Sequence, residues 1–206
     1  MGQKVGKNFE YQEITNKTPN YYYNLGVNFQ YGKRNISPCT YKAVKYYKKA
    51  GDLPEALLKL GIIYYTSYCF MDYKKARKCF EKAGNLPEAL LNLGDIYRLG
   101  KGVKRCFEKA KYYYEKAGNL PEAYIRIGIL YANGQGVEQD YEEAIKYYKR
   151  AGNLPRAYYL LGKLYEKGTG VEQDYEEARK YYIKSWPNNH LSVLSLNHIN
   201  KILSNK

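Results

Sequence analysis

The chain has 206 residues, and 45% of them are hydrophobic, so it can bury a core as one elongated or one compact body. It holds 27 tyrosines against five phenylalanines and one tryptophan, which predicts a thin core with many half-exposed rings. Its net charge is +14, and no stretch is long and apolar enough to cross a membrane, so we expect no membrane insertion.

Most of the positive excess falls in residues 20–123. An acidic partner, nucleic acid or an anionic membrane surface could use such a charge. Because the excess is spread over the sequence instead of packed into one run, we favour a solvated lysine-rich surface. The four cysteines follow no repeated pairing, so we expect free thiols in a reducing compartment. They are Cys39, Cys69, Cys79 and Cys106.

In chain order, residues 1–19 come first and are polar with little periodicity, which predicts a flexible N-terminal arm. They lack the apolar run of a signal peptide, so we expect a cytoplasmic protein, with secretion or delivery into a host as the alternative. Five repeats follow in residues 20–186, with predicted bounds of 20–53, 54–86, 87–120, 121–154 and 155–186. Residues 187–206 are predicted to form a C-terminal capping helix and tail, since a terminal repeat needs its last apolar face covered.

Two markers define the repeat. The segment Ala-Gly-Asn/Asp-Leu-Pro-Glu/Arg-Ala begins at Ala50, Ala83, Ala117 and Ala151, at spacings of 33, 34 and 34 residues. A glycine after Leu or Ile recurs at the same period, at Gly26, Gly61, Gly94, Gly128 and Gly162. Two markers with one period of about 34 residues predict a helical repeat protein.

Each repeat is expected to hold two antiparallel helices. The first begins at the proline, which the first helical turn tolerates, and an Asn or Asp two residues earlier is expected to cap it. The second helix begins after an aspartate in the last two repeats, Asp140 and Asp174. A glycine is expected to end each second helix, as at Gly118 and Gly152. In the second helices alanine and an aromatic ring alternate at helical spacing, as in Ala144-Tyr148-Ala151, so we expect neighbouring helices to approach closely and interlock. The marker glycine inside each first helix also predicts a close helix–helix contact.

The pattern Leu-Gly-x-x-Tyr, Gly-x-Gly-Val, Asp-x-x-x-Ala and Tyr-Tyr-x-x-Ala-Gly resembles the Sel-one-like repeat, a relative of the tetratricopeptide repeat. Cys39 and Cys106 depart from it, because they stand where Asp140 and Asp174 stand. The resemblance implies an all-α fold, a right-handed α-α superhelical solenoid of about five helix-turn-helix repeats plus a C-terminal capping helix. It also implies a scaffold or adaptor without catalysis or cofactor.

The partner-binding face is predicted by analogy with the tetratricopeptide layout, in which first helices line the concave side. The expected partner-binding residues are Tyr23, Val27, Tyr31, Leu58, Ile62, Tyr65, Asp95, Arg98, Ile129, Tyr159 and Lys163. Aromatic anchors near an arginine are typical of protein interfaces. The alternative for the position three before each glycine is a simple core role.

Candidate catalytic or metal-binding residues are sparse. His190 and His198 have neither metal-ligand nor acid–base spacing, and the Glu142-Glu143 pair lies in a first turn, where the helix dipole favours anions. We therefore expect no enzyme and no metal site. The leading hypothesis is an adaptor for a protein or peptide with acidic character, in a specific version a bacterial protein that sequesters a cognate toxin or host factor. The alternatives are a basic nucleic-acid-binding solenoid and self-association.

Overall fold

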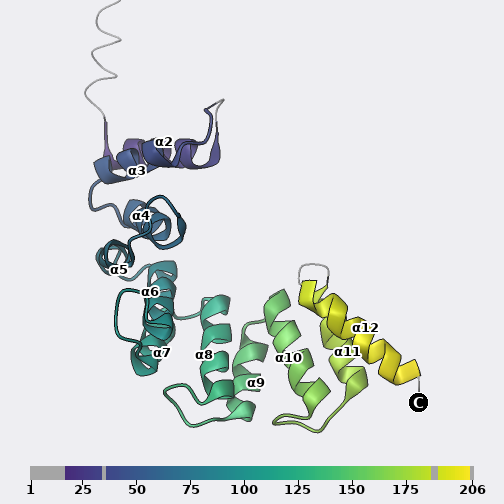
Figure 1. Ribbon diagram of the computed structural model, residues 1–206. Coiled ribbons are helices and arrows are strands. Elements are labelled where there is room, and N and C mark those ends of the chain that lie inside the picture. Colours follow the sequence, from purple (N-terminus) through teal and green to yellow (C-terminus); the bar gives the residue numbers. More distant parts are fainter. Residues whose placement is uncertain (1–16, 34–35, 187–189, 205–206) are drawn as a thin grey trace, which may run out of the picture. The chain divides into compact units, whose positions relative to one another are not determined.

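The computed structural model describes residues 17–33, 36–186 and 190–204, and within these ranges the chain is all α-helical (Figure 1). Most of the predicted arm, residues 1–16, lies outside the described residues. No helix in the described part has the length and apolar character needed to span a membrane. All four cysteines are free thiols, as the sequence predicts.

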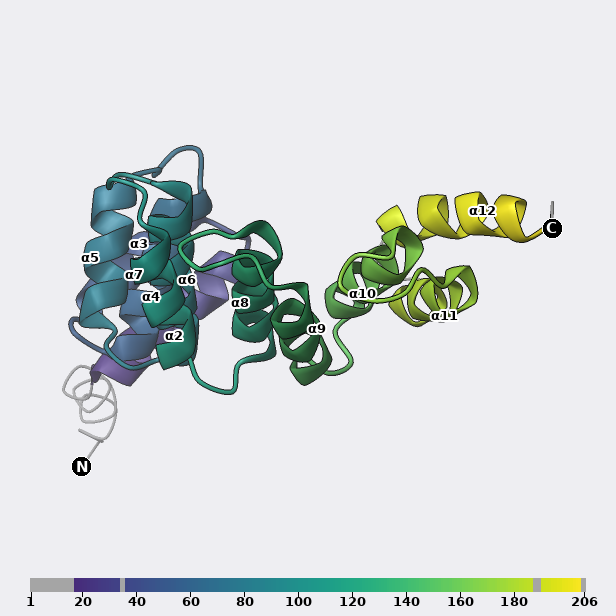
Figure 2. The same cartoon turned by 90° about the horizontal axis from the view of Figure 1, so that it is seen from below.

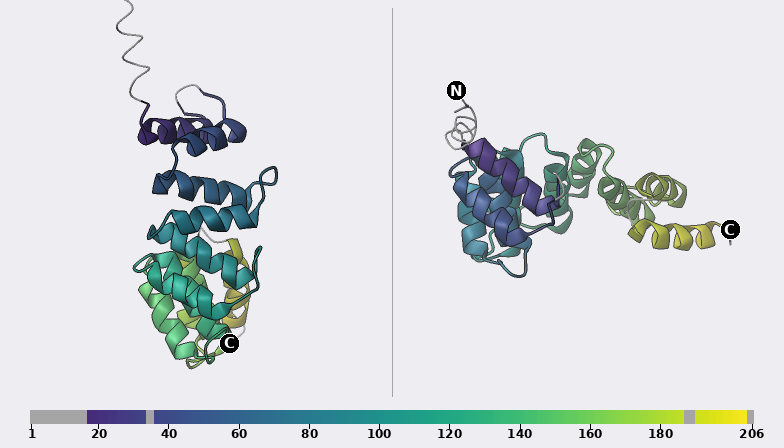
Figure 3. Two further views of the ribbon diagram at one scale, coloured as in Figure 1. Left: turned by 90° about the vertical axis from the view of Figure 1, so that its left-hand side faces the viewer. Right: turned by 90° about the horizontal axis from the view of Figure 1, so that it is seen from above.

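The chain divides into two compact units, and the boundary in the sequence falls between Ala89 and Leu90. The first unit holds two helix pairs: α2 (Pro19–Tyr31) with α3 (Thr40–Lys49), and α4 (Pro54–Thr66) with α5 (Tyr73–Lys82). Within this unit α3 also packs against α4, so the two pairs are stacked. Figure 3 shows α2 and α3, in purple and dark blue, side by side.

The second unit begins inside α6 (Pro87–Leu99) and continues through six more helices. They are α7 (Phe107–Lys116), α8 (Pro121–Asn133), α9 (Tyr141–Arg150), α10 (Pro155–Lys167), α11 (Tyr175–Ser185) and α12 (His190–Ser204). Each helix from α7 to α11 contacts the next one in the chain (Figures 1 and 2). Each compact unit is therefore a stack of helical hairpins.

The marker glycines explain the close packing within each hairpin. A Cβ atom placed on Gly94 would lie 2.3 Å from the ring of Tyr114, and one on Gly128 would lie 2.5 Å from the ring of Tyr148. The alanine-and-ring stripes of the second helices are buried, as predicted. Because any side chain at these glycines would collide with the ring, the sequence pattern fixes how the two helices of a hairpin pack.

The predicted helix caps are partly right. Asp140 and Asp174 each accept a hydrogen bond from the backbone N–H three residues later, at 2.9 Å. The first helices are not capped as expected: Leu120 and Leu154 occupy the N-cap positions and make no side-chain cap bond. Asn119 instead accepts a hydrogen bond from the hydroxyl of Tyr124, and the amide oxygen of Asn153 is likewise taken by a tyrosine hydroxyl.

The last helix covers the end of the second unit. The side chain of Ile199 on α12 is fully buried against Ala178 and Tyr182 of α11. Buried hydroxyls of Ser185 and Ser192 hydrogen-bond to each other across the same contact. Only one side of α12 is covered, since 65% of Leu194 is exposed.

Candidate protein-binding site

The predicted site residues divide between the two compact units. In the first unit Tyr23, Val27 and Tyr31 lie on α2, and Leu58, Ile62 and Tyr65 lie on α4. In the second unit Asp95 and Arg98 lie on α6, Ile129 lies on α8, and Tyr159 and Lys163 lie on α10. All eleven belong to first helices of their hairpins.

The first unit presents aromatic and apolar side chains. Tyr31 is 53% exposed, and the amines of Lys33 and Lys59 lie 6.0 and 5.8 Å from its ring centroid. The ring of Tyr65 packs edge-on against Tyr73, with centroids 5.6 Å apart. Tyr31 is therefore the most open aromatic group among the predicted residues, and two cations accompany it.

One of the predicted residues of α2, Val27, also borders a hollow. Val27 lines it together with Asn24 and Asn28, and its volume is about 420 Å³. Tyr23 instead lies against the buried ring of Tyr47, with the ring centroids 6.0 Å apart. One side of α2 thus faces the hollow, and another packs on its own hairpin.

In the second unit Asp95 stands at the centre of a polar cluster that joins three helices. Its carboxylate accepts from the Tyr114 hydroxyl at 2.8 Å and from Arg98 of its own helix at 3.2 Å. Arg126 of α8 binds both carboxylate oxygens, at 2.9 and 3.1 Å. The side chain of Asp95 is only 14% exposed, so this carboxylate is used inside the molecule.

The cluster perturbs its own tyrosine. Burial, with the nearby charge and hydrogen bond of Asp95, raises the pKa of the Tyr114 hydroxyl. The neutral hydroxyl donates to the carboxylate and is held in place by it. We therefore assign the Tyr114 hydroxyl a structural role, because its raised pKa keeps it protonated at neutral pH and it donates to the Asp95 carboxylate.

Arg156 adds a third guanidinium close to this cluster. Burial, together with the charges of Arg126 and Arg98, lowers its pKa. It has no ion-pair partner among the described residues, whereas Arg98 and Arg126 share Asp95. Three cations therefore gather around one internal carboxylate.

The place of Arg156 in its helix makes the charge unfavourable for folding. It lies in the first turn of α10, where the helix dipole favours an anion. Glu55, Glu88 and Glu122 occupy the matching position in the other helices that start with Leu-Pro. Arg156 therefore opposes the helix dipole and has no ion-pair partner among the described residues, which indicates a functional role at this surface.

A hollow of about 270 Å³ lies beside these arginines. It is lined by Glu122, Ile125, Arg126, Leu154, Pro155 and Arg156. The lining combines two guanidinium groups with apolar walls, and Glu122 supplies the single acidic group. Such a hollow can take an acidic side chain together with an apolar neighbour.

The sequence-based selection of binding residues did not include Arg126 or Arg156, although the repeat pattern contains an indication for Arg156. The fourth copy of the first marker has Arg where the other three have Glu. Arg126 had no such signal, because its role depends on the stacking of α8 on α6. Ile129 and Lys163, which were predicted, line a second hollow between α8 and α10.

The described residues offer little for catalysis. No group of three or more His, Cys, Asp or Glu side chains in them could hold a metal ion. In the site three guanidinium groups and apolar walls accompany the carboxylates of Asp95 and Glu122, and this excess of donors suits recognition of a negatively charged group.

Helical hairpins stacked one on another within each compact unit define an α-solenoid repeat protein. The model of the Sel1 repeat matches residues 19–53, 54–86, 87–120, 121–154 and 155–185. The chain therefore belongs to the Sel1 repeat family. Members of this family are generally protein–protein interaction scaffolds and are typically non-catalytic.

Solved structures agree with this assignment. A Sel1 repeat protein from Oxalobacter formigenes is 30% identical with a TM-score of 0.77, over 89% of this chain and 78% of that one. A protective antigen of uropathogenic Escherichia coli is 28% identical with a TM-score of 0.75, over 88% of this chain and 41% of that one. The chain thus spans less than half of the antigen. The search of curated proteins gives no match.

A third neighbour shares the fold. The immunity protein Pa5087 from Pseudomonas aeruginosa is 24% identical with a TM-score of 0.53, and the match covers 81% of this chain and 64% of that one.

Proposed function

We propose that this protein is a scaffold that binds an acidic segment of a partner protein on the first helices of its second compact unit. The observation that carries the proposal is the group of three guanidiniums, Arg98, Arg126 and Arg156, around the single carboxylate of Asp95. An arginine offers five donors in a planar fork and binds a carboxylate with two parallel hydrogen bonds. Arg156 is the member whose donors are free for a partner.

The neighbouring hollow supports a protein partner over a simple ion. Ile125, Leu154 and Pro155 give it apolar walls. A partner that places an acidic side chain on Arg156 can bury an apolar side chain against these walls at the same time. Interfaces gain most of their affinity from a few such anchors.

The test uses Arg156→Glu, which restores the Leu-Pro-Glu-Ala pattern of the other repeats. This change favours the fold through the helix dipole, yet it reverses the charge that the partner would meet. Lys104→Glu is the matched control, since it changes the net charge equally at an exposed loop position.

The experiment is affinity capture from the native host with the wild-type protein and both variants, followed by calorimetry with the purified partner. We expect an acidic partner whose affinity falls by at least about tenfold in Arg156→Glu and stays unchanged in Lys104→Glu. Equal binding by Arg156→Glu and wild type would contradict the proposal. A nucleic acid that binds at low salt and is lost at moderate salt would support the basic nucleic-acid-binding alternative instead.

A narrower form of the proposal is an immunity-type or host-interaction role, in which the partner is a cognate toxin or a host factor. The neighbour that is an immunity protein supports this form only through a shared fold. The identity of the captured partner tests it directly.

A further inference from the structure

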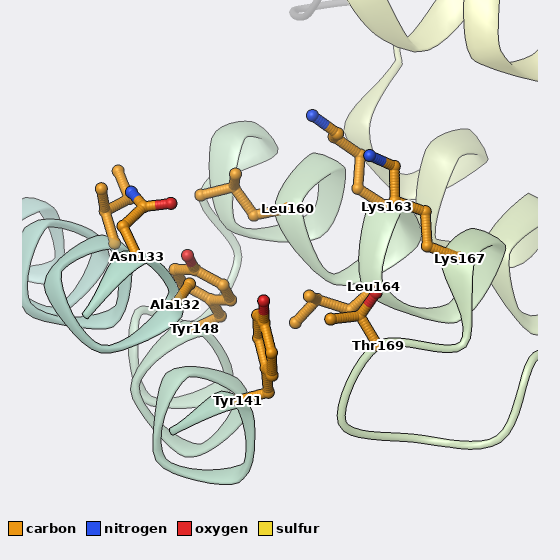
Figure 4. A pocket seen from close by; sticks show the side chains of 10 residues that line it. Ala132, Asn133, Tyr141, Tyr148, Leu160, Lys163, Leu164, Lys167 and Thr169 are labelled. Atoms are coloured by element: carbon orange, nitrogen blue, oxygen red, sulfur yellow. The ribbon is translucent and has the colours of Figure 1, made fainter. Parts of the chain in front are cut away.

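The second unit contains a hollow of about 400 Å³ between α8 and α10, with two tyrosines of α9 at its base (Figure 4). Asn133 lies on the α8 side, and Lys163 and Lys167 lie on the α10 side. The volume falls within the range of pockets that bind small groups. Neither Asp nor Glu lines it, so its charge is wholly positive.

The hydroxyl of Tyr148 distinguishes this hollow from the rest of the molecule. Tyr148 is only 2% exposed, and its hydroxyl has no hydrogen-bond partner among the described residues, yet the residue lines the hollow. Burial raises the pKa of this hydroxyl, so it is a neutral donor. Among the described residues the fully enclosed polar atom without a partner is Nε of Arg77, so the Tyr148 hydroxyl is not sealed off but opens onto the hollow, where it can donate to a ligand.

The equivalent tyrosines show how the fold normally satisfies this group. The hydroxyl of Tyr47 donates to Gln30 at 2.5 Å, and that of Tyr182 donates to Glu166 at 2.5 Å. Both acceptors stand four residues after the marker glycine. In the repeat of Tyr148 that position is Ala132, which has no acceptor.

The second repeat has another way to avoid an unpaired hydroxyl. Its ring at this position is Phe80, which is fully buried and packs against Gly61 in the same way. A tyrosine is therefore not required for packing at this place in the hairpin. The fourth repeat nevertheless has a tyrosine at this position, Tyr148, although it lacks the acceptor that the first and fifth repeats supply.

The other polar groups of the hollow point to the same kind of ligand. Lys163 and Lys167 are one helical turn apart and have no ion-pair partner among the described residues. The amine of Lys163 rests 5.8 Å from the ring centroid of Tyr159, which does not neutralise it. A carboxylate accepts hydrogen bonds only, so it suits a pocket that offers amines and hydroxyls.

The remaining walls define what accompanies the carboxylate. Ile129, Leu160 and Leu164 line the hollow beside the polar groups. A free inorganic anion would leave these apolar walls in contact with water. A peptide that carries an aliphatic side chain next to its acidic residue would cover them.

We propose that this hollow is a binding pocket for an acidic residue with an aliphatic neighbour in an extended peptide, and that the Tyr148 hydroxyl and the two lysines hold the carboxylate. This proposal rests on the proposed scaffold function, because it names the chemistry of a second contact on the same unit. Arg156 does not line this hollow, although its charge acts on the Tyr148 hydroxyl, so the two contacts use different lining residues in one electrostatic environment.

The probe is the synthetic tetrapeptide acetyl-Leu-Glu-Leu-Glu-amide, titrated into ¹⁵N-labelled full-length protein and followed by NMR. We expect shifts concentrated in residues 129–133 and 160–169. The peptide acetyl-Leu-Gln-Leu-Gln-amide, which has the same shape without charge, should bind at least about tenfold more weakly. Equal binding of the two peptides would overturn the proposal, and so would stronger binding of inorganic phosphate than of the acidic peptide.

Three variants assign the contacts. Tyr148→Phe keeps the ring that packs on Gly128 and should lower affinity for the acidic peptide by about tenfold. Lys163→Gln/Lys167→Gln should lower it at least as much, and Lys149→Gln on α9 should leave it unchanged. Unchanged affinity in Tyr148→Phe, with the thermal unfolding of the variant like that of wild type, would overturn the role of the hydroxyl. The pocket is tested with a synthetic peptide and the scaffold proposal with a partner captured from the host, so failure of one is distinguishable from failure of the other.

Discussion

The third and fourth repeats, residues 87–120 and 121–154, form the same kind of hairpin but differ in the hydrogen bonding of one buried tyrosine. In both, a second-helix tyrosine lies against a first-helix glycine: Tyr114 on Gly94, and Tyr148 on Gly128. The Tyr114 hydroxyl donates to Asp95, which directly follows the glycine. The residue that follows Gly128 is Ile129, so the Tyr148 hydroxyl finds no such acceptor.

This difference shows that the packing of a repeat and its polar chemistry are set by different residues. The glycine and the ring are constant because the helices could not approach without them. The residues within one turn after the glycine are free to vary, and they decide whether the hydroxyl is satisfied inside the fold or remains available to a ligand. Repeats that look equivalent in a solenoid can therefore differ in function.

The largest predicted effect tests the packing of a second-helix ring on the marker glycine, which all five repeats share. Gly94→Leu should destabilise the protein by at least about 3 kcal/mol, because the new side chain collides with a ring that Asp95 holds in place. Gly128→Leu should cost less, since the Tyr148 ring borders the 400 Å³ hollow and can move towards it. Urea unfolding followed by circular dichroism compares the two variants. A greater loss for Gly128→Leu would contradict this account.

The same division explains what the sequence could predict. The repeat period, the prolines at helix starts and the close contacts expected at the marker glycines follow from local chemistry, and the structure confirms the all-α solenoid built from them. The expected caps on the first helices were wrong because Asn119 and Asn153 bind tyrosine hydroxyls of the following helix instead. Such a choice between two acceptable partners is decided by side-chain geometry, which the sequence pattern does not contain.

The candidate site was predictable only in part, for a related reason. Asp95, Arg98, Ile129 and Lys163 were chosen by their position after the glycine, and the structure places them in the polar cluster or beside the second hollow. Arg126 reaches Asp95 from the next repeat, 31 residues away, and no local pattern indicates that contact. Whether these residues bind a partner stays a prediction.

The second prediction removes the charge at the centre of the polar cluster. Asp95→Asn should destabilise the protein by about 2 kcal/mol, because Arg98 and Arg126 lose their shared partner while both remain partly buried. Added salt should reduce this loss by screening the repulsion among the arginines. Urea unfolding at low and high salt measures both effects.

The control for this prediction is Glu143→Gln, which breaks an exposed ion pair with Lys146 on α9. Exposed pairs contribute little, so the change should be within about 0.5 kcal/mol. A loss in Asp95→Asn no larger than that of the control would show that the cluster has no special role in the fold.

The third prediction compares the two hydroxyls directly. Tyr114→Phe should cost about 1 kcal/mol, because Asp95 loses its shortest hydrogen bond. Tyr148→Phe should be neutral or slightly stabilising, since its hydroxyl has no partner to lose among the described residues. Thermal and urea unfolding of both variants give the two values. Equal losses would mean that Tyr148 has an internal partner, which would also weaken the case for the pocket.

The smallest predicted effect concerns the starts of the second helices, where the same two repeats differ again. Asp140 caps α9 by accepting from the Glu143 N–H, whereas Cys106 at the start of α7 makes no cap bond. Its thiol instead lies 3.2 Å from the carboxylate of Glu108. Helix α7 therefore begins without the bond that the fourth repeat has.

Exchanging these residues between the two repeats sharpens the comparison. Asp140→Cys should destabilise the protein by about 1 kcal/mol through the lost cap. Cys106→Asp should stabilise it by less than that, about 0.5 kcal/mol, because the new carboxylate lies close to Glu108 and is repelled by it. The double exchange should equal the sum of the single changes, since the two sites share no partner. Unfolding midpoints of the three variants measure this, and a Cys106→Asp variant less stable than wild type would show that the carboxylate repulsion exceeds the gain from the cap.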